Sequence, residues 1–290
     1  MRFCQSLMYS HASDWLAIAR CAESVGFDAV ALSDHVVYPD KLESSYPYSD
    51  DGRPVFGPVT PWPDVWVTTG ALAAVTERLR FITNVYVLPA RNPFVVAKAV
   101  GTAAFLSGDR VQLGVGAGWM REEFDHLEQS FRRRGARMEE QIEVLRTLWR
   151  GGMVEHHGEF YDFDRVQMAP VPARPVPVLI GGQSDVALRR AARIGDGWIG
   201  TQYRLDELRG YVERLQAFRR EAGTEGRPFE IVAAVNDKVP SPEVCAELEG
   251  MGVTMLITSA WLMAGRSWAS LDENVRALED FAATYIAPLR

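Results

Sequence analysis

Residues 109–119 read DRVQLGVGAGW, and this stretch decides the fold. Its mostly aliphatic run, 110–115, is followed abruptly by Gly116, Ala117 and Gly118. A strand that is buried on both faces reads as a continuous apolar run, and glycines at its end let the backbone come close to another group. We interpret the stretch as a parallel strand that ends at a ligand site. A tight strand-to-helix turn would also explain the glycines, because it needs them for its backbone angles.

Strands and helical segments alternate along the whole chain. The predicted strands are residues 2–8, 27–32, 79–85, 110–115, 176–180, 197–201, 229–235 and 253–258. Such alternation implies parallel strands joined by right-handed crossovers. Eight units of this kind predict an α/β fold, a single (β/α)8 TIM barrel over residues 1–290, with its site at the C-terminal ends of the strands. The alternative, an open doubly wound sheet, is disfavoured because residues 114–118 lack the spacing of the dinucleotide fingerprint.

Two segments interrupt this alternation, one after strand 2 and one before strand 5. Residues 36–62 hold five prolines and four tyrosines or phenylalanines, without any periodicity. A long irregular segment within a compact domain is usually functional or mobile, so we expect a lid over the site. Residues 153–175 predict an inserted hairpin or loop, and within it we expect His156 and His157 to face solvent.

Composition and charge exclude several classes of function. The 290 residues are 47% hydrophobic and carry a net charge of −7, which argues against a nucleic-acid-binding surface. The basic run 132–134 is interpreted as a solvated helix start, with a phosphate site as the alternative. Three cysteines far apart fit reduced thiols, and no metal-ligand spacing, signal peptide or membrane span is present. We therefore expect a cytoplasmic protein that acts on a small molecule, away from membranes.

The barrel brings polar groups and glycines from separate strand ends to one rim. These candidate residues are Asp34, His35, Asn84, Val85, Gly116, Ala117, Gly118, Gly181, Gly182, Gln183, Ser184 and Thr201. Imidazole exchanges a proton near neutral pH, so His35 is a candidate acid or base that Asp34 could tune or replace, although a buried structural histidine is the alternative. Ser184 at a helix start suits a phosphate, and an ordinary N-cap explains it equally well. Among the tryptophans, Trp119 alone is expected near the ligand.

These residues resemble the bacterial luciferase-like flavin and deazaflavin oxidoreductases. The resemblance rests on Leu32-Ser33-Asp34-His35, on Phe81 to Val85 leading to Asn92-Pro93, on Leu113 to Trp119 with Glu123-Phe124, and on Leu179 to Gly182 followed by Gly195 to Trp198. It covers nearly the whole chain in the right order, and the last forty residues match least distinctively.

The resemblance implies a luciferase-like TIM barrel that binds coenzyme F420 or FMN at the strand ends. In the deazaflavin branch an Asp-His pair lies close to the cofactor ring, where Asp34 and His35 match it, and a non-prolyl cis peptide lies behind the ring, where Asn84-Val85 matches it. Residues 116–119 and 181–184 align with loops that contact the cofactor. His35 is the first candidate for proton transfer and Glu122 or Glu123 the second, while Arg91 and Arg121 could bind the anionic cofactor tail.

Three functions remain open at this point. The leading one is hydride transfer between coenzyme F420 and a small organic substrate. The second is a two-component monooxygenase that uses reduced FMN and molecular oxygen, and the third is a non-catalytic flavin-binding barrel. Members of the family often form dimers through barrel helices, so we expect a homodimer, without a sequence argument for the face.

Overall fold

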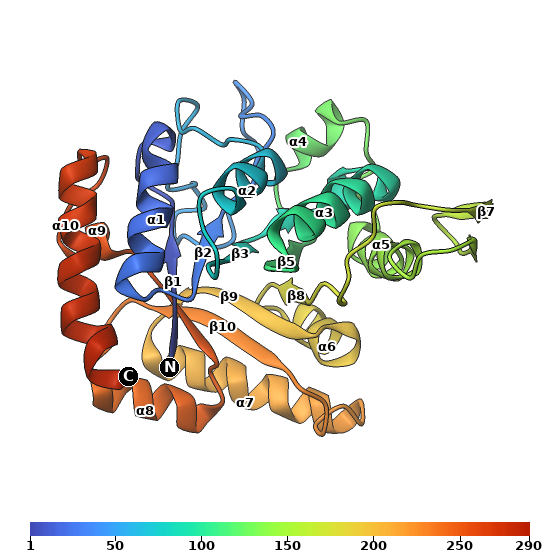
Figure 1. Ribbon diagram of the computed structural model, residues 1–290. Coiled ribbons are helices and arrows are strands. Elements are labelled where there is room, and N and C mark those ends of the chain that lie inside the picture. The colour runs from blue at the N-terminus through green and yellow to red at the C-terminus, as the bar shows by residue number, and fades with distance from the viewer.

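Eight short apolar segments lie side by side as a closed ring of parallel strands (Figure 1). The computed structural model describes all residues, 1–290. The ring consists of β1 (Arg2–Ser6), β2 (Ala29–Leu32), β3 (Arg80–Thr83), β5 (Val111–Gly116), β8 (Val178–Gly181), β9 (Gly197–Tyr203), β10 (Glu230–Val235) and β11 (Met255–Thr258). Pairing of β3 with β5 closes it. The predicted TIM barrel is confirmed, and the open sheet is excluded.

The strands are buried on both faces, which explains their continuous apolar sequences. In β2, Ala29 and Ala31 belong to a small cluster inside the barrel, whereas Val30 and Leu32 belong to the large core between strands and helices. Side chains of a strand alternate between its two faces, so a barrel strand fills both layers at once. The small residues fit the crowded interior, and the larger ones pack under the helices.

Helices cover the outside of the ring (Figure 1). The main ones are α1 (Trp15–Val25), α2 (Val65–Ala73), α3 (Pro93–Ser107), α5 (Arg134–Leu148), α6 (Asp185–Ile194), α7 (Leu205–Glu221), α8 (Pro242–Met251) and α10 (Leu271–Phe281). Local sequence sets their starts: the Asp64 carboxylate accepts two backbone N–H groups at the start of α2, and the Asn92 side chain accepts the Phe94 N–H. No helix is long and apolar enough to cross a membrane.

The structure contains elements that the sequence pattern did not predict. They are β4 (Tyr86–Val87), α4 (Arg121–His126), α9 (Ala260–Met263), the 3-10 turns Ala12–Asp14, Leu88–Ala90 and Ala287–Leu289, and a π-helical turn, Ala282–Ile286. Strand β3 ends at Thr83 rather than at Val85, because the chain bulges before it rejoins β5 as β4. The helix α4 has only six residues and a polar sequence, so it has no apolar stripe that would have revealed it.

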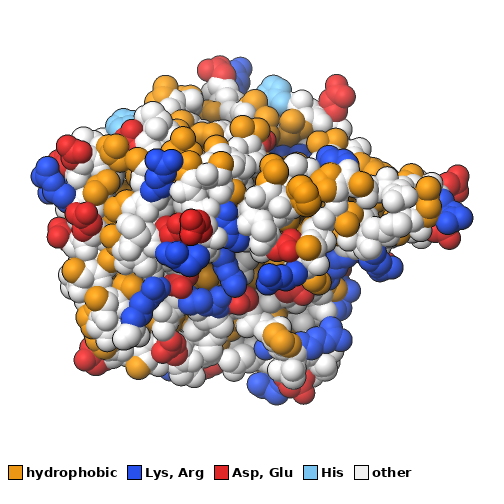
Figure 2. All heavy atoms as spheres, in the orientation of Figure 1, with side chains coloured by type: hydrophobic (Ala, Val, Ile, Leu, Met, Phe, Trp, Pro, Cys, Tyr) orange, Lys and Arg blue, Asp and Glu red, His pale blue; other side chains and the backbone are white.

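A hairpin of β6 (Val154–His157) and β7 (Asp162–Val166) projects from the side of the barrel, with charged groups at its tip (Figure 2). The prediction that His157 faces solvent is confirmed, since 61% of its side chain is exposed. The same prediction for His156 is wrong. Alternation along β6 turns its ring inward, stacked on Phe163 and with Nε2 3.3 Å from the Glu140 carboxylate.

Candidate active site

A cavity of about 1050 Å³ opens at the C-terminal rim of the barrel. Its lining includes the predicted residues Asp34, His35, Asn84, Val85, Gly116, Ala117, Gly118, Trp119, Gly181, Gly182, Gln183, Ser184 and Thr201. The other candidates, Glu122, Glu123, Arg91 and Arg121, do not line it. Ligand cavities in proteins measure about 300–1,000 Å³, so this one has room for a cofactor together with a second molecule.

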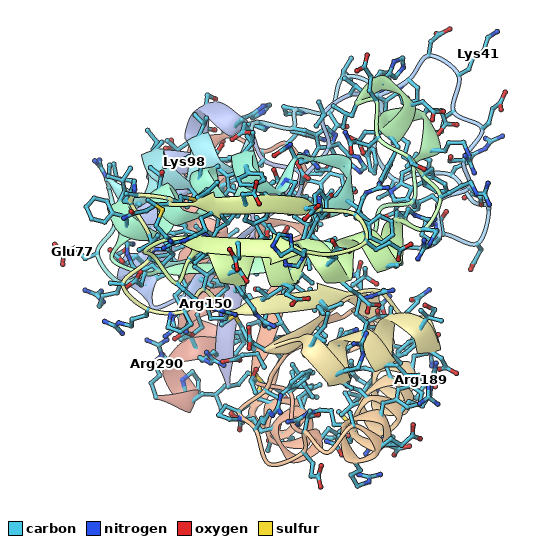
Figure 3. All side chains as sticks on the ribbon, turned by 90° about the vertical axis from the view of Figure 1, so that its right-hand side faces the viewer. Lys41, Glu77, Lys98, Arg150, Arg189 and Arg290 are labelled. Atoms are coloured by element: carbon cyan, nitrogen blue, oxygen red, sulfur yellow. The ribbon has the colours of Figure 1, made fainter.

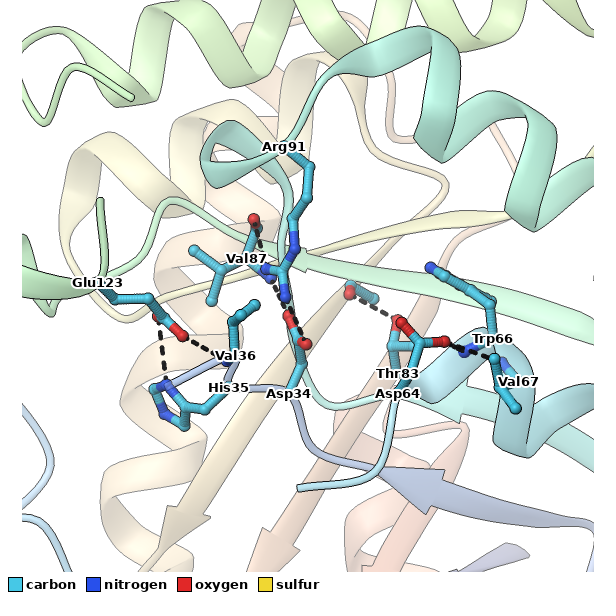
Figure 4. Close-up of polar contacts among 11 residues, drawn as sticks. Asp34, His35, Val36, Asp64, Trp66, Val67, Thr83, Val87, Arg91 and Glu123 are labelled. Atoms are coloured by element: carbon cyan, nitrogen blue, oxygen red, sulfur yellow. Dashed lines mark hydrogen bonds and ion pairs between the residues drawn. The ribbon is translucent and has the colours of Figure 1, made fainter. Parts of the chain in front are cut away.

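The buried carboxylate of Glu123 contacts the Nδ1 side of the His35 ring (Figure 4). Its Nδ1 lies 3.3 Å from Glu123 Oε2, and Glu123 Oε1 accepts the Val36 backbone N–H at 2.6 Å. Burial opposes ionisation of Glu123, but the hydrogen bond and charge of His35, together with the Val36 N–H, leave its pKa below the ordinary value. An ionised carboxylate only accepts, so Nδ1 carries a proton and Nε2 is the nitrogen left for a ligand. Glu123 is thus a positioning residue.

Asp34 does not contact the His35 ring through a hydrogen bond. Its Oδ1 accepts Arg91 Nη2 at 2.7 Å, and its Oδ2 accepts the Val87 backbone N–H at 3.0 Å (Figure 4). Burial raises the pKa of Asp34, although the charge of Arg91 and the Val87 N–H oppose that rise. Asp34 therefore ties the end of β2 to the bulge between β3 and β4. Arg91, which we expected at the rim for an anionic tail, is engaged in this contact and does not line the cavity.

The bulge forms the floor of the cavity. The Asn84–Val85 peptide bond is cis, at the position that the family resemblance implied. A methyl group added to Gly116 would lie 2.7 Å from one γ-carbon of Val85, and one added to Gly181 would lie 3.0 Å from the other. Because both neighbours are glycines, the Val85 side chain can lie between them and leave a smooth apolar surface.

One end of the cavity is polar and carries two arginines. Gly182 has φ of +110°, a conformation that favours glycine, and its carbonyl accepts the Trp198 indole N–H at 2.8 Å. Ser184 then caps α6, accepting the Ala187 N–H. Arg134 and Arg190 line the cavity together with this turn.

The sequence reasoning missed Arg190, and for the run that contains Arg134 it favoured a solvated helix start over a phosphate site. The run 132–134 was expected to be solvated, yet Arg134 Nε donates to the Gly118 carbonyl at 2.9 Å. Arg121, the other cation expected at the rim, instead lies over the Phe131 ring and does not line the cavity. The available signal for Arg134 was its place in a basic run at the start of α5, whereas no local pattern distinguished Arg190 in the second turn of α6.

The segment 36–62 covers the cavity without any helix or strand of its own, and we call it the lid. Its residues Tyr46, Phe56 and Trp62 line the cavity opposite Trp119. Side-chain hydrogen bonds hold the lid to the barrel. Glu122 Oε1 accepts the N–H groups of residues 43 and 44, Glu123 Oε1 accepts the Val36 N–H, and the remaining contacts join Arg121 N–H to Ser44 Oγ, the Tyr9 hydroxyl to the carbonyl of residue 55 and Gln183 to the carbonyl of residue 47. The segment was expected to cover the site, but Trp62 was not expected near a ligand, because most aromatic side chains belong to the core and no pattern singled this one out.

The chain is similar in sequence and in fold to several known proteins. Residues 3–237 match the family described as luciferase-like monooxygenase. The uncharacterized protein Rv0940c of Mycobacterium tuberculosis is 39% identical over 289 residues, which is 99% of each chain. The F420-dependent glucose-6-phosphate dehydrogenase of Tsukamurella paurometabola is 32% identical over 240 residues, 79% of this chain and 66% of the relative. The crystal structure of the monooxygenase RslO1 from Streptomyces bottropensis has the same fold, with a TM-score of 0.77 at 17% identity and full coverage of both chains.

Proposed function

Because the chain belongs to the luciferase-like monooxygenase family, we propose that it is an oxidoreductase that transfers hydride between coenzyme F420 and a small organic substrate. The observation that carries this proposal is the position of His35. Its Nδ1 is bound by Glu123, and its ring lies in the wall of a cavity whose floor is Val85 between two glycines. The 32% identity to an enzyme named for coenzyme F420 supports the choice of cofactor.

The floor fits the flat ring of a deazaflavin. Any side chain at Gly116 or Gly181 would displace Val85, since a single added carbon already lies within 3.0 Å of it. A flat apolar surface of this kind favours a flat ring over it through burial of apolar area. Asn84, Val85, Gly116 and Gly181 would hold the ring, and Ala117 and Thr201 line the same cavity.

The polar end of the cavity fits an anionic tail. The first turn of α6 presents free backbone N–H groups and the positive end of the helix dipole, which stabilise a phosphate. Gly182, Gln183 and Ser184 would hold this group, with Arg134 and Arg190 as neighbouring cations, although Arg190 Nε is already paired with Glu139 Oε1 at 2.8 Å. These arginines take the place that we first gave to Arg91 and Arg121.

The residues of this chain would then orient the substrate and transfer its hydroxyl proton. When bound, the deazaflavin supplies a carbon centre that exchanges hydride and reacts poorly with oxygen. His35 Nε2 would take the hydroxyl proton of a substrate whose adjacent carbon loses hydride, and return it in the reverse direction. Asp34 holds the floor through the Val87 N–H, and the lid limits the access of water to the reacting atoms.

Binding of cofactors to the purified protein tests the proposal. Coenzyme F420 and FMN are titrated separately, and binding is followed by the fluorescence of each compound. We expect micromolar or tighter binding of coenzyme F420 and at least tenfold weaker binding of FMN. Binding of FMN alone would favour the two-component monooxygenase, and binding of coenzyme F420 without turnover of any reductant or oxidant would favour a non-catalytic barrel.

A further inference from the structure

The face of His35 that is open to a ligand is surrounded by aromatic rings. The ring centroid of His35 lies 4.9 Å from that of Phe56, 5.3 Å from that of Trp62 and 6.1 Å from that of Trp119. Tyr46 continues this surface, 5.1 Å from Trp119. We call Tyr46, Phe56, Trp62 and Trp119 the aromatic wall, and all four line the cavity. A surface of this kind binds apolar bodies and flat rings.

No Lys or Arg lies over a ring of the aromatic wall, and Arg134, which lies near Trp119, is engaged by the Gly118 carbonyl. The cavity-lining cations are Arg134, Arg190 and Lys238, which come from α5, α6 and the segment after β10. The lid carries Lys41 and Arg53, but both are exposed and neither lines the cavity. Figure 3 shows Lys41 at the outer edge of the molecule, pointing away from the barrel.

The charges that lie nearest to His35 are negative. Asp34 and Glu123 are its neighbours, and both are buried beside it. The lid contributes four acidic residues, Asp40, Glu43, Asp50 and Asp51, against its two basic ones. An anionic substrate group beside His35 would lose its water and lie next to two buried carboxyl groups, which is costly.

Few polar side-chain atoms of the cavity lining are both shielded from solvent and unpaired, and these are neutral. Among the lining residues, Trp62 Nε1 and Ser259 Oγ are shielded from solvent and have no hydrogen-bond partner. Trp62 Nε1 can donate to a substrate oxygen beside His35 Nε2, since the two ring centroids lie 5.3 Å apart and an indole N–H donates. A sugar with many hydroxyl groups would leave most of its polar atoms unpaired against the aromatic wall.

We infer that the substrate is an uncharged, largely apolar alcohol or ketone, held by the aromatic wall and bound through a single oxygen, and not a phosphorylated or carboxylated compound. This inference rests on the proposed function, since the alcohol would pass hydride from its carbon to coenzyme F420 and its hydroxyl proton to His35, forming the C=O bond. The reverse reaction would reduce the ketone with the reduced coenzyme.

A matched pair of ketones tests the inference. Acetophenone and 4-acetylbenzoate share a ring and a carbonyl group and differ only by a carboxylate. Their binding to the purified protein, with and without coenzyme F420, is measured by calorimetry beside that of cyclohexanone and glucose 6-phosphate. We expect both neutral ketones to bind at least tenfold more tightly than the two anions. Equal or tighter binding of either anion, or no binding of any neutral ketone, would overturn the inference.

Variants of the lid show whether the aromatic wall is the binding surface. Phe56→Ala should weaken acetophenone binding about tenfold, because burial of an aromatic side chain against the ligand is lost. Binding of coenzyme F420 should not change. Val59→Ala is the matched control, since Val59 is a lid residue that is 92% exposed and does not line the cavity. Equal affinity of both variants for acetophenone would contradict the assignment of the wall.

The two proposals fail in different ways. If the protein binds coenzyme F420 but shows no preference for neutral ketones, the substrate inference is wrong and the cofactor proposal stands. If it prefers neutral ketones but does not bind coenzyme F420, the cofactor proposal is wrong, and the inference that the aromatic wall binds neutral, largely apolar compounds stands.

Discussion

Two walls of the same cavity are built in different ways. The rim wall consists of strand ends, where Val85, Gly116 and Gly181 are fixed by the hydrogen-bonded ring of the barrel. The lid wall consists of large aromatic side chains on an irregular segment, 36–62, that a few side-chain contacts hold in place. The rim offers backbone and small groups, whereas the lid offers apolar area.

This difference assigns the two walls different tasks, the rim wall to the proposed cofactor and the lid wall to the substrate. A change in the rim wall disturbs strand pairing, so the surface proposed for the cofactor is tied to the fold itself. A change in the lid alters the surface offered to the substrate without touching the barrel. The four predictions below challenge this division, beginning with the largest expected effect.

The first prediction compares an added methyl group in each region. In Gly114→Ala the new carbon would lie 1.9 Å from the Thr83 carbonyl oxygen, which belongs to the neighbouring strand. We expect a loss of about 3 kcal/mol or more in the free energy of unfolding, or failure to fold. Gly57→Ala in the lid is the control, because no atom lies within 4 Å of its added carbon. Thermal unfolding of both variants measures the contrast, and similar melting temperatures would contradict it.

The second prediction concerns His35, which lies where the two walls meet. His35→Ala should lower turnover about 100-fold, the usual contribution of a general acid or base, while affinity for coenzyme F420 changes little. His157→Ala, on the exposed hairpin, is the control for loss of a histidine. Steady-state kinetics with a neutral ketone and reduced coenzyme F420 provide the measurement. Unchanged turnover would remove His35 from the mechanism.

The third prediction concerns the pH dependence of the buried pair. The pKa of Glu123 is below its ordinary value of 4.5 in the folded protein, so the ionised form stabilises the fold. That stabilisation is present above pH 4.5 and is lost as the pH falls through the lowered pKa. Glu123→Gln should therefore cost about 2 kcal/mol at pH 7 and progressively less below pH 4.5.

Urea unfolding of the wild type and the variant, at pH 7 and at a pH below 4.5, measures this difference. Glu143→Gln, an exposed change on α5, should show no such dependence. A cost for Glu123→Gln that stays constant down to low pH would mean that the carboxylate is not ionised in the folded protein.

The fourth and smallest effect concerns the anchoring of the lid. Glu122→Ala removes the acceptor for the Glu43 and Ser44 backbone N–H groups, at 2.7 and 2.9 Å. We expect tryptic cleavage after Lys41 to become about fivefold faster, equivalent to roughly 1 kcal/mol, because the lid opens more often. Asp125→Ala, exposed on the same helix, is the control. Equal cleavage rates would show that other contacts hold the lid.

The sequence by itself determined the barrel and most of its rim. Strand periodicity, helix caps and glycine positions are local properties, and parallel strands necessarily bring their C-terminal ends to one side. For this reason Gly116, Gly181 and His35 could be placed at one cavity from the sequence. The homodimer stays a prediction, because no local pattern specifies which face of the barrel would meet a second copy.

Only the tertiary structure decided which side chains contact each other. Glu123 is 88 residues from His35 in sequence and Arg91 is 57 residues from Asp34, yet each pair is in contact. The helix α4, the path of the lid and the inward direction of Arg134 all depend on packing against distant segments. Sequence periodicity reports which face of an element is buried, but a hydrogen-bond partner is selected by distances in space that the chain only acquires when the barrel closes.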